Sequence, residues 1–189
     1  MQTDFLLKNY NTFQLEVKSN YFTSFCSTED LITILKNKPS HEVLVLGEGS
    51  NVLFTKDFEG LILYNTIKGI EVQSKGENIY LEIGGGENWH DIVTYCVENN
   101  WGGIENLALI PGTMAAGPIQ NIGAYGVELK DVFVSLDMTF GEFNCYVECY
   151  INSSVITYAT NSLWISHSML YSRTSLRMLF QYMTLNVPC

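Results

Sequence analysis

Two loops rich in glycine contain the residues whose types and spacing could do chemistry in this chain. The first loop is Gly47-Glu-Gly-Ser-Asn51, which directly follows the apolar run Glu42–Leu46. Glycines let successive backbone N–H groups converge on one anion, and Ser50 and Asn51 add neutral hydrogen-bond donors. The loop is therefore typical of a phosphate-binding turn, although a plain turn at the end of a strand has the same composition.

The second loop is the long, almost uncharged stretch from Leu107 to Gly126. Pro111-Gly112 and Gly117-Pro118 mark turns within it. Gln120 and Asn121 offer amide donors and acceptors beside backbone that glycines leave free to bend. The stretch is too apolar for a solvent loop and too rich in glycine for a helix. It indicates the wall of a buried ligand site, with a buried turn between core strands as the alternative.

The distribution of charge indicates which groups would hold an anion in these loops. The net charge is −10, and no Lys or Arg occurs between Lys75 and Lys130. A bound diphosphate would therefore be held mainly by backbone amides and by Ser, Thr, Asn or Gln side chains. The acidic balance argues against a nucleic-acid or membrane-surface binder. No apolar run reaches the roughly 18 residues that a spanning helix needs.

Other kinds of chemistry find little support in the sequence. Both Gly-x-Gly pairs lack the third glycine of the dinucleotide fingerprint, which Val52 and Trp89 replace. His90 lies beside a tryptophan in a helical pattern and is interpreted as a structural or surface residue. Cys145 and Cys149 have no histidine placed to complete a metal site. We assign no metal ligand and no catalytic residue, and the five cysteines fit a reducing cytoplasm.

The elements that position these loops alternate between helix and strand. Ser27 to Asp30 predicts a capped helix that ends at Asn37–Pro39. The strands are expected at Glu42–Leu46, Leu61–Tyr64, Ile70–Gln73 and Ile79–Ile83, with a hairpin at Gly76–Asn78. A second helix follows Gly84–Gly86, with an apolar face formed by Trp89, Ile92, Val93, Cys96 and Val97. A further strand is expected before Pro111. The order predicts an α/β or α+β domain, and we expect the α+β class.

The composition of the chain changes near residue 140. Lys, Asp and Gly are absent from residues 142–189, and no clear helical or strand period follows. We expect a domain over residues 1–140 and a divergent tail over 141–189. A small β-rich extension would explain this tail, but we favour a change of reading frame.

Three long motifs in the right order resemble one enzyme family. They are Leu44–Phe54, Gly84–His90, and Gly103–Gly112 followed by Pro118–Gly126; Asn11-Thr-Phe13 also fits. Residues 5–137 resemble UDP-N-acetylenolpyruvoylglucosamine reductase, a cytoplasmic flavoenzyme of peptidoglycan synthesis, and hence of cell-wall biogenesis, cell shape and division. The resemblance implies an FAD-binding domain of the vanillyl-alcohol-oxidase type, truncated before the substrate domain.

The resemblance also implies a cofactor site and a reaction. NADPH would reduce FAD, and hydride would pass to the enolpyruvyl double bond of a UDP-sugar, with the cofactor supplying the chemistry. The implied FAD-binding residues are Gly47, Glu48, Gly49, Ser50, Asn51, Val52, Leu53, Ile110, Pro111, Gly112, Thr113, Gly117, Ile119, Gln120, Asn121, Gly123, Ala124, Tyr125 and Gly126.

One departure from the family bears on activity. Where the family has Tyr-Arg-Asp-Ser, the nearest segment here is Tyr158-Ala-Thr-Asn-Ser162. We therefore expect FAD binding without turnover. A non-catalytic FAD-binding module, a different FAD-linked oxidoreductase and a non-flavin scaffold remain as alternatives.

Overall fold

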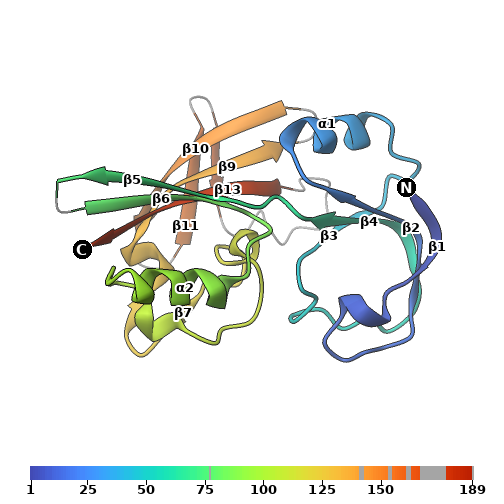
Figure 1. Cartoon of the computed structure of the whole chain (residues 1–189). Coiled ribbons are helices and arrows are strands. Elements are labelled where there is room, and N and C mark those ends of the chain that lie inside the picture. The colour runs from blue at the N-terminus through green and yellow to red at the C-terminus, as the bar shows by residue number, and fades with distance from the viewer. Residues whose placement is uncertain (77, 141–142, 153–154, 161–162, 167–177, 189) are drawn as a thin grey trace.

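The computed structural model describes the backbone of residues 1–76, 78–140, 143–152, 155–160, 163–166 and 178–188. Side chains are described for residues 1–76, 78–137 and 182–188. Within these residues the chain forms two main sheets, one small hairpin and two α-helices (Figure 1). The predicted α+β class is confirmed.

The first sheet has the order β1-β2-β4-β3. Its strands are β1 (Gln2–Leu6), β2 (Lys18–Phe25), β3 (Val43–Leu46) and β4 (Phe58–Asn65). β1 runs antiparallel to β2, whereas β2, β4 and β3 are parallel to one another. The predicted strands at 42–46 and 61–64 are confirmed as β3 and as part of β4. We call this sheet with its helix the first unit.

Helix α1 (Thr28–Lys36) covers one face of the first sheet. Ser27 caps it, because its side chain accepts a hydrogen bond from the Asp30 amide at 3.1 Å. Leu31 and Leu35 are buried against the sheet. The helix predicted from the capping pattern is therefore confirmed. The other face of the sheet packs on the N-terminal loop, which includes the short 3₁₀ turn Lys8–Tyr10.

The second sheet has the order β12-β11-β10-β9-β13-β6-β5, and all neighbouring strands are antiparallel. Its strands are β5 (Ile70–Lys75), β6 (Asn78–Gly84), β9 (Phe133–Phe140), β10 (Phe143–Asn152), β11 (Val155–Thr160), β12 (Leu163–Ser166) and β13 (Met178–Pro188). The predicted hairpin at Gly76 joins β5 to β6. We call this sheet with its helix the second unit.

Helix α2 (Trp89–Glu98) packs on the second sheet and forms the main core with it. Trp89 is fully buried, and its indole Nε1 donates to the Leu107 carbonyl at 2.8 Å. Ile92, Val93 and Cys96 are buried as the helical period predicts. Val97 is 51% exposed, so its assignment to the buried face was wrong. It lies in the last turn, at the edge of the stripe.

One expectation about strands was wrong. The stretch before Pro111 forms the 3₁₀ turn Glu105–Leu107 instead of a strand. The segment after residue 141, where the sequence shows no clear period, contains β10 to β13. β13 lies between β6 and β9 within the second sheet (Figure 1). The division at residue 140 and the reading-frame change remain predictions.

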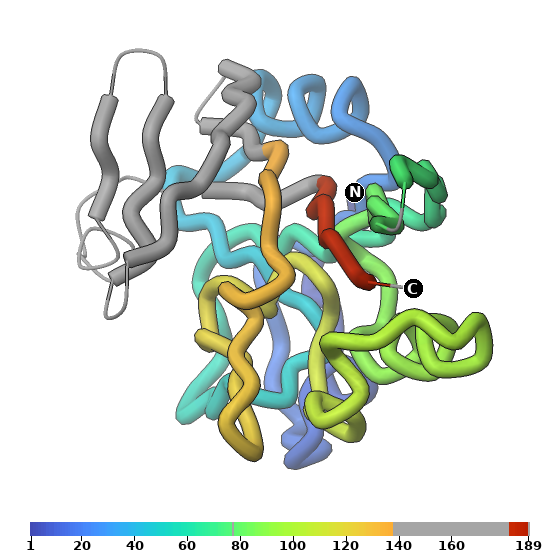
Figure 2. The backbone as a smooth tube through the Cα atoms, turned by 90° about the vertical axis from the view of Figure 1, so that its left-hand side faces the viewer, coloured from blue at the N-terminus to red at the C-terminus, as the bar shows by residue number. Residues whose placement is uncertain are grey.

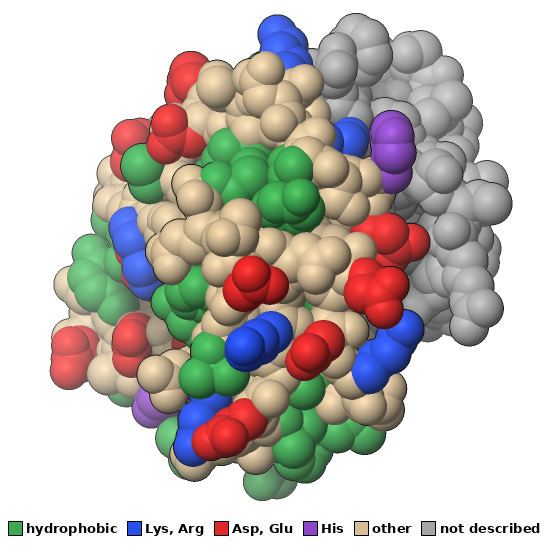
Figure 3. All heavy atoms as spheres, turned by 90° about the vertical axis from the view of Figure 1, so that its right-hand side faces the viewer, with side chains coloured by type: hydrophobic (Ala, Val, Ile, Leu, Met, Phe, Trp, Pro, Cys, Tyr) green, Lys and Arg blue, Asp and Glu red, His purple; other side chains and the backbone are tan. Residues whose placement is uncertain are grey.

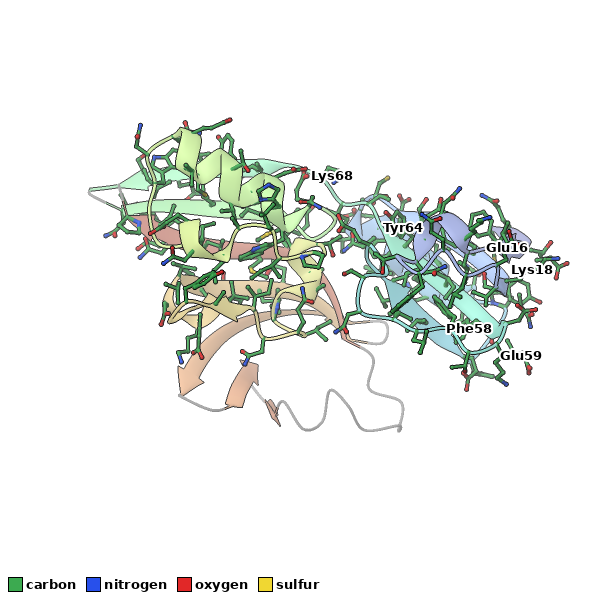
Figure 4. All side chains as sticks on the ribbon, turned by 90° about the horizontal axis from the view of Figure 1, so that it is seen from below. Glu16, Lys18, Phe58, Glu59, Tyr64 and Lys68 are labelled. Atoms are coloured by element: carbon green, nitrogen blue, oxygen red, sulfur yellow. The ribbon has the colours of Figure 1, made fainter. Side chains whose placement is uncertain are left out.

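The two units are joined by the short segment that follows β4. Tyr64 lies at the end of β4 in the first unit, and Lys68 lies beside the second unit (Figure 4). Gly84 and Gly86 pack closely on this segment, because a Cβ at either glycine would lie 2.6–2.8 Å from a backbone oxygen of Ile67 or Asn65. These glycines therefore permit the close approach of the two units.

Figure 2 shows the segment around residues 110–131 as the yellow-to-orange part of the tube, and this segment belongs to the second unit, because Met114, Ile122 and Leu129 are buried in its core. On the side of the molecule in Figure 3, acidic and basic side chains neighbour one another over the first unit. Two ion pairs of this unit are Lys8–Glu16 at 2.7 Å and Lys56–Glu59 at 3.6 Å.

No helix in the described part of the chain is long and apolar enough to cross a membrane.

Candidate functional site

The loop Gly47–Leu53 begins where β3 ends, at the carboxyl end of the parallel strands of the first unit. Gly49 is buried and has φ +66°, a conformation that favours glycine. A Cβ at this position would lie 2.1 Å from the Tyr10 carbonyl oxygen. The Gly49 carbonyl accepts from the Thr12 amide at 3.2 Å. The N-terminal loop thus fixes the shape of the candidate phosphate-binding turn.

The amide groups of this turn are available to a ligand. Among the described residues, no hydrogen bond uses the amide N–H of Gly49, Ser50 or Asn51. Consecutive N–H groups around a glycine of positive φ form an anion-binding concavity. This arrangement supplies the neutral donors that the sequence predicts for an anion, without any cation in the loop itself.

The second loop turns at Pro111-Gly112. Gly112 is buried with φ +121°, and its carbonyl accepts from the Trp89 amide at 3.0 Å. Gln120 donates through Nε2 to the Pro111 carbonyl at 3.3 Å. A Cβ at Gly112 would lie 3.0 Å from this Gln120 nitrogen. The loop is therefore folded tightly on itself and on the first turn of α2.

Glu48 connects the two loops directly. Its carboxylate accepts from the Gly112 amide at 3.0 Å, although the two residues are far apart in the sequence. The same carboxylate accepts a short hydrogen bond from Nδ2 of Asn88. Asn88 in turn caps α2, because its Oδ1 accepts from the Asp91 amide at 3.1 Å. Three loops therefore meet at Glu48.

Further backbone hydrogen bonds join the glycine segment before α2 to the second loop. The Ala115 amide donates to the Gly85 carbonyl, and the Met114 amide donates to the Glu87 carbonyl, each at 2.9 Å. Thr113 is buried, and its Oγ1 would lie 3.0 Å from a Cβ placed on Gly47. Gly47 thus leaves room for Thr113 where the first and second loops pack together.

Four of the remaining predicted residues, Gly123 to Gly126, lie on a hairpin formed by β7 (Gly123–Ala124) and β8 (Val127–Glu128). Tyr125 and Gly126 form its tip, with φ +53° and +83°, the backbone of a two-residue hairpin turn. The Tyr125 side chain is 90% exposed. The hairpin borders a hollow of about 510 Å³ lined by Asn121, Gly123, Ala124, Gly126, Val127, Glu128, Lys130 and Asp131.

The structure therefore divides the predicted FAD residues into two groups. The hydrogen bond from the Gly112 amide to Glu48 joins Gly47–Leu53 to Ile110–Thr113. Asn121, Gly123, Ala124 and Gly126 line the separate hollow. Gly117 is buried in the turn between the groups, while Leu53 and Ile119 are 64% and 40% exposed.

The ionisable groups near the loops are acids, tyrosines and paired lysines. Lys130 pairs with Glu128, and Lys68 pairs with Glu87 at 3.1 Å. Burial raises the pKa of the Tyr64 hydroxyl, and the nearby Tyr10 and Glu48 raise it further. Tyr64 therefore keeps its proton near neutral pH and remains a neutral donor at the end of β4.

His90 has a structural contact. Its Nδ1 accepts from the Leu109 amide at 3.3 Å, and Leu109 has φ +61°. The interpretation of His90 as structural agrees with this contact. Among the residues whose side chains are described, no group of three or more potential metal ligands occurs. Cys145, Cys149 and Ser162 lie outside the residues with described side chains.

Sequence reasoning missed two residues of the site. Asn88 was not singled out, although an Asn three residues before Asp91 is an available capping signal. Tyr10 was not singled out either, and its carbonyl closes over Gly49 through a contact that leaves no local trace in the sequence.

Comparisons with known proteins agree on the kind of domain. A family model described as an FAD binding domain matches residues 21–142. UDP-N-acetylenolpyruvoylglucosamine reductase of Flavobacterium johnsoniae is 46% identical over 136 residues, which are 71% of this chain and 40% of the relative. The enzyme of the same name from Yersinia pestis is 48% identical over 134 residues, covering 70% of this chain and 39% of the relative. The chain thus spans about two-fifths of the length of these relatives.

Solved structures share the fold. The UDP-N-acetylenolpyruvylglucosamine reductase of Thermus caldophilus superposes with a TM-score of 0.68 at 15% identity, covering 96% of this chain and 60% of that one. A solvent-stable cholesterol oxidase gives a TM-score of 0.57 at 14% identity, covering 91% and 35%. At such low identity these likenesses show the fold alone, and they agree with the expected type of FAD-binding domain.

Proposed function

Because this chain belongs to the family of FAD binding domains, we propose that its loops hold the diphosphate of FAD with neutral donors. The observation that carries the proposal is the turn after β3, where the amide N–H groups of Gly49, Ser50 and Asn51 have no acceptor among the described residues. Gly49 keeps the backbone in the conformation that aims such groups at an anion. The side chains of Ser50 and Asn51 would add two further donors.

The residues present suit the cofactor. The turn between Gly47 and Leu53 would hold the diphosphate, and Pro111–Thr113 would form the wall against the flavin. Asn121, Gly123, Ala124 and Gly126, with Tyr125 at the hairpin tip, would extend the site toward the hollow. In this proposal the main donors are backbone amides, and their binding to the diphosphate immobilises no side chain.

The reaction proposed for the whole lineage is reduction of an enolpyruvyl group. When bound, FAD supplies two-electron transfer from NADPH to the double bond of UDP-N-acetylenolpyruvoylglucosamine, the UDP-sugar in the relatives' name. In this proposal the described residues bind and orient the cofactor, and Tyr64 contributes a protonated hydroxyl beside Glu48. A cytoplasmic role in peptidoglycan synthesis belongs to the same proposal.

Cofactor binding is the appropriate test for this chain, since it spans only part of its relatives' length. The purified chain is titrated with FAD, and flavin fluorescence is followed together with the absorbance near 450 nm. FMN and riboflavin serve as matched ligands, because only FAD has the diphosphate that joins the flavin to adenosine. We expect FAD to bind much more tightly than riboflavin. A natively folded chain that binds FAD no better than riboflavin would refute the proposal.

Turnover is measured separately with NADPH and the UDP-sugar. The absence of turnover that we expect from the sequence remains a prediction, and ordinary turnover by this chain would contradict it. A non-catalytic FAD-binding module would bind FAD in the first assay and show no activity in the second.

A further inference from the structure

Glu48 is an unusual residue to find beside a diphosphate site. Its carboxylate lies in the same turn as the amide groups proposed to bind the anion, so a free carboxylate there would repel FAD. In the structure this carboxylate is engaged within the protein. One oxygen accepts from the Gly112 amide at 3.0 Å, and the other accepts from Nδ2 of Asn88.

Given the proposed function, we infer that Glu48 is a positioning residue that holds three loops in register and does not itself contact the cofactor. Its two acceptor oxygens are matched by two donors from different segments. The Gly112 amide belongs to the loop that turns toward the proposed flavin wall, and Asn88 begins α2. Losing Glu48 would release the Pro111-Gly112 turn from the phosphate-binding turn.

Asn88 has two roles that constrain its identity. Its Oδ1 caps α2 by accepting from the Asp91 amide, and its Nδ2 donates to Glu48. An aspartate at position 88 could still cap the helix, because carboxylates are good N-caps. It could not donate, and it would place a second negative charge opposite Glu48. The pair Glu48 and Asn88 is therefore matched in polarity as well as in position.

This matching allows an exchange of the two groups. In Glu48→Gln alone, the new amide can accept from Gly112, but its NH₂ then meets the NH₂ of Asn88. In Asn88→Asp alone, two carboxylates face each other. In the double variant Glu48→Gln/Asn88→Asp, the glutamine accepts from Gly112 and donates to the aspartate, which still caps α2. The summed formal charge of positions 48 and 88 is −1 in the double variant, as it is in the parent.

The test measures FAD affinity and amide exchange in these three variants and in Glu48→Ala, with Glu59→Gln as the control for removing an exposed carboxylate. Loss of one partly buried hydrogen bond leads us to expect FAD binding about tenfold weaker in each single variant. The double variant should return to within about threefold of the parent, because the cycle measures coupling between contacting groups. Glu59→Gln should bind like the parent.

Hydrogen exchange of the Gly112 amide, followed by NMR without FAD, gives an independent measurement. It should be faster in Glu48→Ala and Asn88→Asp, and slow again in the double variant. If the double variant recovers slow exchange but not FAD affinity, Glu48 contacts the cofactor and the inference is overturned. If Glu48→Ala leaves exchange at Gly112 unchanged, the positioning role is also overturned.

The two proposals can fail separately. If the parent chain fails to bind FAD, the proposed function fails. The exchange of the Gly112 amide and the thermal melts of the four variants would still show whether Glu48 and Asn88 hold the loops together.

Discussion

Replacing Gly49 by alanine should destabilise the chain more than the same change at Gly76. The two glycines have nearly the same backbone conformation, with φ +66° and +68°. They differ in their surroundings. A Cβ at Gly49 would lie 2.1 Å from the Tyr10 carbonyl oxygen and 2.8 Å from the Asn11 Cα, whereas a Cβ at Gly76 meets no heavy atom within 4 Å.

The magnitudes follow from these surroundings. A left-handed conformation costs a residue with a Cβ about 1–2 kcal/mol, and this applies to both variants. Overpacking against backbone that must shift costs about 1–3 kcal/mol more, and this applies to Gly49 alone. We therefore expect Gly49→Ala to lower the free energy of unfolding by about 2–5 kcal/mol, and Gly76→Ala by about 1–2 kcal/mol.

Urea unfolding followed by circular dichroism measures both values, and flavin fluorescence measures FAD binding in parallel. Gly49→Ala should also lose FAD affinity, because the amide groups of the turn would be displaced, while Gly76→Ala should retain it. Equal unfolding midpoints for the two variants would refute the steric argument. Gly49→Ala with the parent's FAD affinity would refute the role of this turn in holding the diphosphate.

Three further outcomes can be measured. Ser27→Ala should lower the free energy of unfolding by about 1 kcal/mol in urea melts, because it removes the cap of α1. Burial, and then the charge of Glu71, raise the pKa of the Glu82 carboxyl in the folded chain. The folded chain therefore holds this proton more tightly than the unfolded chain does, and the stability that results is present at low pH and is lost as the pH rises above 4.5. Glu82→Gln should therefore melt higher than the parent at pH 7 and lose that advantage toward pH 4; equal melts at pH 7 would contradict this. A hydrogen bond to Asp30, and its charge, raise the pKa of the exposed Cys26 thiol, so Asp30→Asn should lower that pKa and speed alkylation of Cys26 at pH 8, as peptide mapping would show.

Local patterns in the sequence were sufficient for the elements whose partners are near in the chain. Ser27 and the apolar positions after it predicted α1, and the spacing from Trp89 to Cys96 predicted the buried face of α2. Both depend on interactions within one helix, which have a fixed period. The hairpin at Gly76 was predictable for the same reason, since its strands are adjacent in sequence.

β13 shows where this reasoning fails. Met183, Leu185 and Val187 are buried and alternate with residues that are only partly buried, which is a strand period. The alternation covers only the end of the strand, and the preceding Met178-Leu-Phe180 does not alternate, so the strand was not recognised. Its position between β6 and β9 depends on pairing with residues far away in the sequence, and no local signal specifies that register.

The sequence indicated which kinds of residue form the candidate site, but it did not indicate which of them contact one another. The glycines indicated backbone donors, and Ser50 and Asn51 indicated neutral side-chain donors; their contact with FAD stays a prediction. The role of Glu48 was not predictable, because it depends on a donor at Gly112 and another at Asn88 that only the folded chain brings together. The sequence of a phosphate-binding loop does not show whether a carboxylate in it contacts a ligand or accepts hydrogen bonds from the protein itself.

The central place of β13 also affects how the chain is made. Residues 178–188 leave the ribosome after every other described element, yet they pair with both β6 and β9. Until then, the facing edges of these two strands have no partner from the same chain. Open edges invite pairing with other molecules, and a late, distant strand slows closure of the sheet. Yield during expression should therefore depend on slow synthesis, low temperature or chaperones.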